Sequence, residues 1–104
     1  MKRICTLHDA WVSWCSGEKF PIAFFGDSTT DGNTTTGYER NQFGKDSLNP
    51  NAYCKILEDR LREATENREL RIYNAGFSGT TAKWGRENFQ QVFLDNPHYK
   101  DVKM

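Results

Sequence analysis

A serine stands directly behind a short apolar segment. Ser28 follows Gly26 and Asp27, which end an apolar run over residues 20–25. Ligands in open α/β sheets bind outside the carboxyl ends of the strands, and a serine hydroxyl placed there can attack a carbonyl carbon when a base removes its proton. Gly26-Asp27-Ser28 is therefore the first candidate for chemistry.

A second glycine-containing turn follows another apolar segment. Residues 70–74 precede Ala75-Gly76-Phe77-Ser78-Gly79, with Asn74 at the junction. Glycine permits unusual backbone angles and lets a substrate approach a backbone N–H closely. Neighbouring strand ends could then supply a nucleophile from one turn and N–H donors for a developing oxyanion from the other.

An amphipathic helix is expected before the first strand, capped by Thr6 and stopped by Gly17. Its apolar face consists of Leu7, Ala10, Trp11, Trp14 and Cys15. We interpret the two tryptophans as core or interface residues, in preference to a carbohydrate platform. This segment, at about residues 1–17, is read as a helical extension of a single domain that comprises residues 1–104.

Polar residues dominate positions 29–50, which predicts a long surface loop. Asn49 and Pro50 are suited to the cap and first position of a second helix, which should fade near Asn67. Its expected buried stripe is Ala52, Tyr53, Ile56, Leu57, Leu61 and Ala64. Glu58 and Arg62 should pair on the opposite, solvated face.

The rest of the chain predicts a second strand at residues 70–74 and a third helix over residues 81–93. Ala82, Phe89, Val92 and Phe93 should point inward. Residues 101–104 are expected to begin another strand. Because strands alternate with helices, we predict an α/β fold with a parallel sheet. Two parallel strands alone would leave open edges, so we expect a fragment, or self-association through an open sheet edge.

Composition narrows the classes of partner. The chain has 14 basic and 14 acidic residues, which gives no reason to expect nucleic acid or an anionic membrane as a partner. No signal peptide is apparent, and the compartment stays open. Cys5, Cys15 and Cys54 have no zinc-type spacing and read as reduced thiols, two of them on apolar helix faces.

The two strand-end segments together resemble conserved blocks of a known enzyme family. The run from Phe24 through Gly26-Asp27-Ser28-Thr29 to Gly32 resembles the first block of the SGNH (GDSL-type) lipases and esterases. The run Asn74-Ala75-Gly76-Phe77-Ser78-Gly79-Thr80-Thr81 resembles their second block. The resemblance covers roughly residues 18–104, about the first half of such a domain.

This resemblance implies a flavodoxin-like three-layer α/β/α fold, here incomplete, and an esterase or acylhydrolase that forms an acyl-enzyme on Ser28. It implies that Ser28 and Gly79 donate backbone N–H groups to the oxyanion. Asp27 and Asp31 are expected to organise the first turn and its loop, Asn74 to tie the two turns together, and Gly76 to serve as a turn residue. Esters of acetyl or other short acyl groups on carbohydrates are the expected substrates, with no cofactor or metal.

The family's catalytic Asp and His, and a third oxyanion donor, belong to later blocks without a counterpart here. His8 precedes the nucleophile segment, and no aspartate stands three residues before His98. We therefore expect the 104-residue chain alone to be inactive or nearly so. Two alternatives stay open: a flavodoxin-like module that binds phosphate or a nucleotide at its strand-end glycines, and a non-catalytic fragment.

Overall fold

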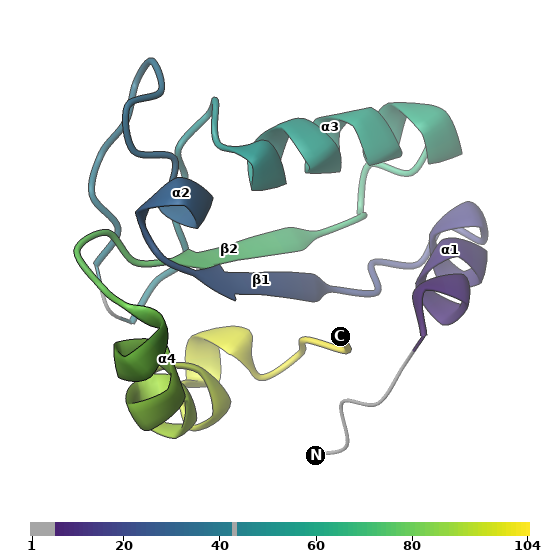
Figure 1. Cartoon of the computed structure of the whole chain (residues 1–104). Helices are drawn as coiled ribbons and strands as arrows, with labels where there is room; N and C mark the ends of the chain where they lie inside the picture. The colour runs from purple at the N-terminus through teal and green to yellow at the C-terminus, as the bar shows by residue number, and fades with distance from the viewer. Residues whose placement is uncertain (1–5, 43) are drawn as a thin grey trace.

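The computed structural model describes residues 6–42 and 44–104. In chain order, the described elements are α1 (Leu7–Cys15), β1 (Ile22–Gly26), α2 (Ser28–Asp31), α3 (Tyr53–Thr65), β2 (Ile72–Gly76), α4 (Ala82–Phe89), the π-helical segment η1 (Gln90–Leu94) and the 3₁₀ turn η2 (Pro97–Tyr99). Figure 1 shows both strands at the centre, with helices above and below them. The predicted mixed α/β class is confirmed.

The sheet contains two parallel strands. β1 pairs with β2 from Ile22 opposite Ile72 to Gly26 opposite Gly76. The first strand begins two residues later than expected, and the second is shifted two residues toward the C-terminus. Because the glycines close both strands in the same register, the two turns that follow them leave the sheet at the same end.

Both outer edges of this small sheet have partners. Along β1, Lys103 donates its backbone N–H to Pro21 O (2.7 Å), and Ala23 donates to Met104 O (2.8 Å). Residues 103–104 therefore run in the same direction as β1, although they form no regular strand. Along β2, Ser47 donates its N–H to Asn74 O (2.7 Å). The expectation that both edges would be open is wrong at these positions.

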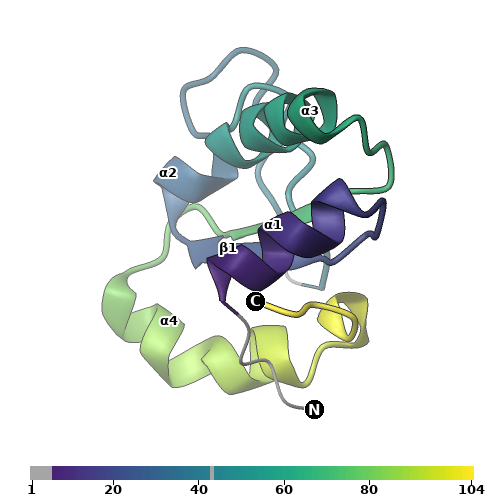
Figure 2. The same ribbon diagram turned by 90° about the vertical axis from the view of Figure 1, so that its right-hand side faces the viewer.

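Helices cover opposite faces of the sheet. α3 lies on one face, while α4, η1 and η2 lie on the other, as the two views agree (Figures 1 and 2). Successive strand residues point to opposite faces, so Ile22 belongs to one apolar cluster and Ala75 to the other. The first cluster contains Ala10, Trp14, Ile22, Cys54, Leu70 and Ile72. The second contains Tyr73, Ala75, Phe77, Phe93, Tyr99 and Val102.

Helix α1 begins and ends where the sequence indicates. Thr6 and Asp9 form a reciprocal capping box, and Gly17 follows the helix with φ +86°. Its predicted apolar face is only partly buried, however, because Ala10 and Trp14 alone are buried in the helix. Trp11 remains 46% exposed, and Leu7 and Cys15 are exposed as well. The apolar face of α1 is therefore wider than the part of it that other described residues cover.

Helix α3 begins later than predicted. Its N-cap is Ala52, which makes no side-chain cap hydrogen bond, while Asn49 is buried in the preceding loop. The buried positions of the helix are Cys54 and Glu58. Tyr53 and Ile56, expected inside, are 42% and 45% exposed. The prediction relied on hydrophobicity alone. In the structure, the side chains buried toward β2 are those of Cys54 and Glu58, which are four residues apart.

Glu58 is a buried carboxylate on this inward face. It accepts a hydrogen bond from the Ile72 backbone N–H at 2.8 Å. Its oxygens also lie 3.3 Å from Arg71 and 3.5 Å from Arg62. The predicted pair with Arg62 is therefore present, but the assignment of Glu58 to a solvated face is wrong. The carboxylate fastens α3 to the start of β2.

Helix α4 begins one residue later than predicted, because Thr81 is its N-cap. Thr81 accepts a hydrogen bond from the Trp84 N–H at 3.1 Å, and the helical segment continues through η1 to Leu94. Gly85 in its middle is buried, and a methyl group there would press on the Phe25 ring. Ala82, expected inside, is exposed. No helix in the described ranges is long and apolar enough to cross a membrane.

We expect Glu58→Gln to lower the free energy of unfolding by roughly 2 to 4 kcal/mol, because it removes a buried charge that several donors share. Urea unfolding followed by circular dichroism measures the change. Glu63→Gln, at an exposed position of the same helix, serves as the control and should shift stability by less than about 0.5 kcal/mol. Equal effects of the two substitutions would contradict this role of Glu58.

The two described cysteines should differ sharply in thiol reactivity. Burial raises the pKa of the Cys54 thiol to about 12, and Cys15 is exposed. In a Cys5→Ser variant, we expect Ellman's reagent at pH 8 to modify one thiol in the native protein and two after denaturation. A further Cys15→Ser substitution should abolish the native reaction. Modification of two thiols under native conditions would refute the burial of Cys54.

Candidate functional site

The first predicted turn is a short helix that starts at Ser28. Asp27 caps α2 by accepting a hydrogen bond from the Thr29 N–H at 3.1 Å, and Gly32 ends it in the left-handed region with φ +98°. Asp27 thus makes the kind of backbone hydrogen bond that was expected of it at this turn. The position of Asp27 follows from β1, which ends one residue earlier.

Ser28 occupies the first position of α2 and is partly exposed. A first-position N–H has no acceptor within its own helix, so it is available to a ligand. Within residues 6–42 and 44–104, no hydrogen-bond partner contacts the Ser28 hydroxyl. The geometry thus presents a serine without a base, since the imidazole of His98 contacts Asp46 instead.

The second turn lies against the first. Phe77 donates its N–H to Gly26 O at 2.9 Å, which extends the pairing past both strand ends. Gly79 is exposed with φ +82°, a conformation that favours glycine. Arg40 donates to Ser78 O at 3.0 Å and thereby holds the turn from outside. The role of Gly79 as an oxyanion donor stays a prediction.

Two residues of β2 attach the turns to one another. Asn74 donates from Nδ2 to Thr30 O at 2.7 Å and accepts the Gly76 N–H at 3.0 Å, as the predicted tie between the turns requires. Gly76 is the last residue of β2 and not part of the turn. A methyl group at this position would overlap the backbone nitrogen of Asp31. Close packing, and not turn geometry, explains this glycine.

Asp31 is the centre of the polar network at these turns. Its side chain is fully buried, and its carboxylate accepts hydrogen bonds from Asn49 Nδ2 (2.9 Å), the Asn41 N–H (3.0 Å) and Ser78 Oγ (2.9 Å). Tyr38 closes the network through a hydrogen bond with the Ser78 hydroxyl. Asp31 therefore holds the loop through donors that lie 10 to 47 residues away in the chain, and not through the local turn chemistry that was expected.

The partners of Asp31 were not foreseen from the sequence. Asn49 donates to both the carboxylate and the backbone oxygen of Asp31, and Ser47 Oγ donates to that same backbone oxygen at 3.2 Å. The only signal was the abundance of Asn, Ser and Thr over residues 29–50. Such residues satisfy buried polar groups, but their spacing does not reveal which group they will meet.

A pocket of about 560 Å³ opens beside Asp27, between the end of β1 and α4. Its lining is mostly apolar and consists of Phe25, Gly26, Asp27, Thr80, Thr81, Ala82, Trp84, Gly85, Arg86 and Phe89. Trp84 therefore lines a pocket next to the candidate serine. An apolar pocket with few polar groups is the usual form of a small-molecule site.

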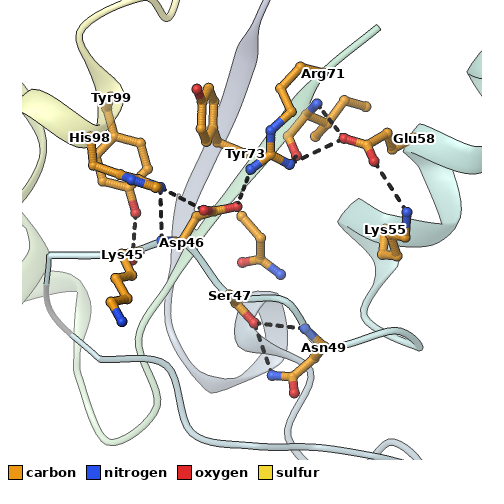
Figure 3. A network of polar contacts seen from close by, with 12 residues as sticks. Lys45, Asp46, Ser47, Asn49, Lys55, Glu58, Arg71, Tyr73, His98 and Tyr99 are labelled. Atoms are coloured by element: carbon orange, nitrogen blue, oxygen red, sulfur yellow. Dashed lines mark hydrogen bonds and ion pairs between the residues drawn. The ribbon is translucent and has the colours of Figure 1, made fainter. Parts of the chain in front are cut away.

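A second polar cluster lies at the opposite half of β2. This cluster is a chain of contacts that joins η2, the loop, the start of β2 and α3 (Figure 3). Its members, in that order, are His98, Asp46, Arg71 and Glu58. No sequence motif pointed to it, because its members are up to 52 residues apart.

Within the described part of the chain, no group of three or more His, Cys, Asp or Glu side chains is arranged to hold a metal ion. Comparisons of the chain with protein-family models, with curated proteins and with solved structures find no match. The two turns are therefore the feature of the chain that points to a function.

Gly76→Ala should lower the free energy of unfolding by about 3 kcal/mol, because the added methyl group meets backbone atoms that cannot move independently. Gly17→Ala provides the control: its methyl group meets open space, and only the positive φ costs stability, about 1 kcal/mol. Chemical denaturation of both variants measures the difference. A Gly76→Ala loss no larger than that of Gly17→Ala would contradict the close packing of the two turns.

Proposed function

We propose that this chain is the nucleophile-bearing part of a serine ester hydrolase of the SGNH (GDSL) type. The observation that carries the proposal is the juxtaposition of two strand-end turns. In the first, the Ser28 hydroxyl has no hydrogen-bond partner among the described residues, and in the second, Gly79 has a left-handed backbone. Both turns stand at the end of a parallel sheet where α/β folds bind ligands.

The arrangement of the sheet supports a flavodoxin-like form of the fold. β1 lies between β2 and residues 103–104, and the connecting helices α3 and α4 cover opposite faces. Right-handed crossovers that leave in opposite directions from a central strand produce this arrangement. β1 is then the central strand, and the proposed nucleophile follows it at the point where the crossover connections leave toward opposite sides.

In the proposed reaction, Ser28 Oγ attacks the ester carbonyl carbon and loses its proton to a base. The N–H groups of Ser28 and Gly79 stabilise the oxyanion, and its collapse breaks the bond to the alcohol oxygen, which takes up the proton. Water then attacks the acyl-enzyme by the same route and releases the acid. The described residues place no base at Ser28, so a complete domain must supply an Asp–His pair from elsewhere.

The pocket beside Asp27 is proposed to hold part of the ester. Its aromatic walls, Phe25, Trp84 and Phe89, suit an acyl chain or the apolar face of a sugar ring, and Arg86 is its one cationic lining residue. Small acyl esters of carbohydrates therefore remain the proposed substrates. Neither a metal nor an organic cofactor has a part in this mechanism.

We expect the 104-residue chain to hydrolyse p-nitrophenyl acetate no faster than its Ser28→Ala variant. A longer form that carries an Asp–His pair should be faster by a factor of roughly 10⁴ to 10⁶, the usual cost of losing triad members. Ser28→Ala in that longer form should abolish the gain. Equal turnover by the short and long forms, or a longer Ser28→Ala variant that keeps its activity, would refute the proposal.

Phosphate or nucleotide binding is the second candidate function. Exposed Gly79 lies beside Arg40, and the N–H of Ser28 has no acceptor within its own helix, so the turns present donors that could bind an anion. Stabilisation of the chain by ATP or inorganic phosphate in a thermal melt, lost in Arg40→Ala, would favour this function over ester hydrolysis.

A further inference from the structure

The pocket between β1 and α4 combines aromatic walls with a single positive charge. Three of its lining residues are the aromatic Phe25, Trp84 and Phe89, and Arg86 is the one cationic side chain among them. Its volume of about 560 Å³ is within the usual range for sites that bind a small organic molecule. A ligand that fits this lining has an apolar body and an anionic group.

The charge of Arg86 is not neutralised by the protein. Arg86 is exposed, and its guanidinium makes no ion pair or hydrogen bond with any residue that the structure describes. The adjacent carboxylate, that of Glu87, lies 4.0 Å from Lys83 instead. A guanidinium presents donors in a planar fork that matches the two oxygens of a carboxylate. Arg86 is therefore available to a carboxylate that enters the pocket.

The end of the pocket nearest the two turns has the opposite charge. Asp27 lines this end, and one of its carboxylate oxygens accepts the Thr29 N–H. Arg86 follows Ala82, the first residue of α4, by four positions, which corresponds to about 6 Å along the helix axis. An anionic group is thus attracted to Arg86 and repelled from Asp27, and this difference fixes the direction of an elongated ligand.

The hydroxyl groups of the lining already have partners within the chain. Thr80 donates from Oγ1 to Phe77 O at 2.6 Å. Thr81 accepts the backbone N–H of Trp84 at 3.1 Å. A sugar ring in this pocket would leave hydroxyl groups without hydrogen-bond partners, which costs free energy. An aromatic ring avoids that cost and gains edge-to-face contacts with the rings of the wall.

We propose that the pocket between β1 and α4 binds an aromatic carboxylate, with its ring against the aromatic walls and its carboxylate on Arg86. The assignment of this ligand to a substrate rests on the proposed ester hydrolysis. A short acyl ester of an aromatic alcohol with an acidic substituent would place its ester group toward Ser28 and its charge at Arg86. The binding of the aromatic carboxylate itself needs neither a base nor a reaction at Ser28.

An NMR titration of the 104-residue chain with 2-naphthoate tests the site without an activity assay. The indole N–H of Trp84 and the amide of Gly85 should shift together and give one dissociation constant. The amide 2-naphthamide has the same rings without the charge, and it should bind about fivefold to tenfold more weakly. Salt at roughly 1 M should remove most of this difference, because it screens an exposed charge.

Two substitutions on α4 separate the charge of Arg86 from the net charge of the helix. Arg86→Met should bind 2-naphthoate and 2-naphthamide equally. Lys83→Met removes the same charge from an exposed residue outside the lining, and it is the matched control that should keep the preference. Ala82→Leu, which places a larger side chain in the lining, should weaken the binding of both compounds.

Equal binding of the two compounds by the wild-type chain would overturn the proposal, as would an unchanged preference in Arg86→Met or shifts confined to residues outside the pocket. Selective binding of 2-naphthoate without labelling of Ser28 by a fluorophosphonate would support the ligand site and count against the hydrolase. Labelling of Ser28 without selective binding would support the hydrolase and overturn the ligand site.

Discussion

The buried carboxylate of Asp31 is the interaction on which the rest of the site depends. A carboxylate without water must be surrounded by donors, since an unpaired buried charge would cost several kcal/mol. The donors come from residues far from Asp31 in the chain, Asn41, Asn49 and Ser78. These hydrogen bonds hold the long loop along β2 and hold the second turn against the first, at the end of the sheet where both strands stop.

The parallel pairing of β1 with β2 makes this convergence possible, and glycines permit its closeness. Gly26 stands opposite Gly76 in the register, and Gly76 leaves room for the backbone of Asp31. With larger residues the first turn of α2 would be held away from β2, and Asn74 could not reach Thr30. Small residues thus stand where two backbones approach, and a cluster rich in aromatic side chains packs on the face of the sheet that α4 covers.

Features that depend on neighbours in the chain could be predicted from the sequence, and features that depend on distant partners could not. Thr6 caps α1 as predicted, because a cap needs only residues two or three positions away. Asn49 was misassigned to such a cap because its real partner, Asp31, is 18 residues distant. The burial of Glu58 and Asp46 could not be predicted from the sequence either. Their burial is offset by Arg71 and His98, and charged residues are rarely expected inside without knowledge of the partners.

We propose that Ser28 is a nucleophile that the two turns hold in place and that lacks only a base. The most direct test is to treat the 104-residue chain with a fluorophosphonate probe, with imidazole added as an external base, and to map the modified residue by peptide mass spectrometry. We expect Ser28 to be labelled in preference to the other serines, imidazole to accelerate the reaction, and Ser28→Ala to remove it. Uniform slow labelling of exposed serines, with no preference for Ser28, would contradict a nucleophilic role of Ser28.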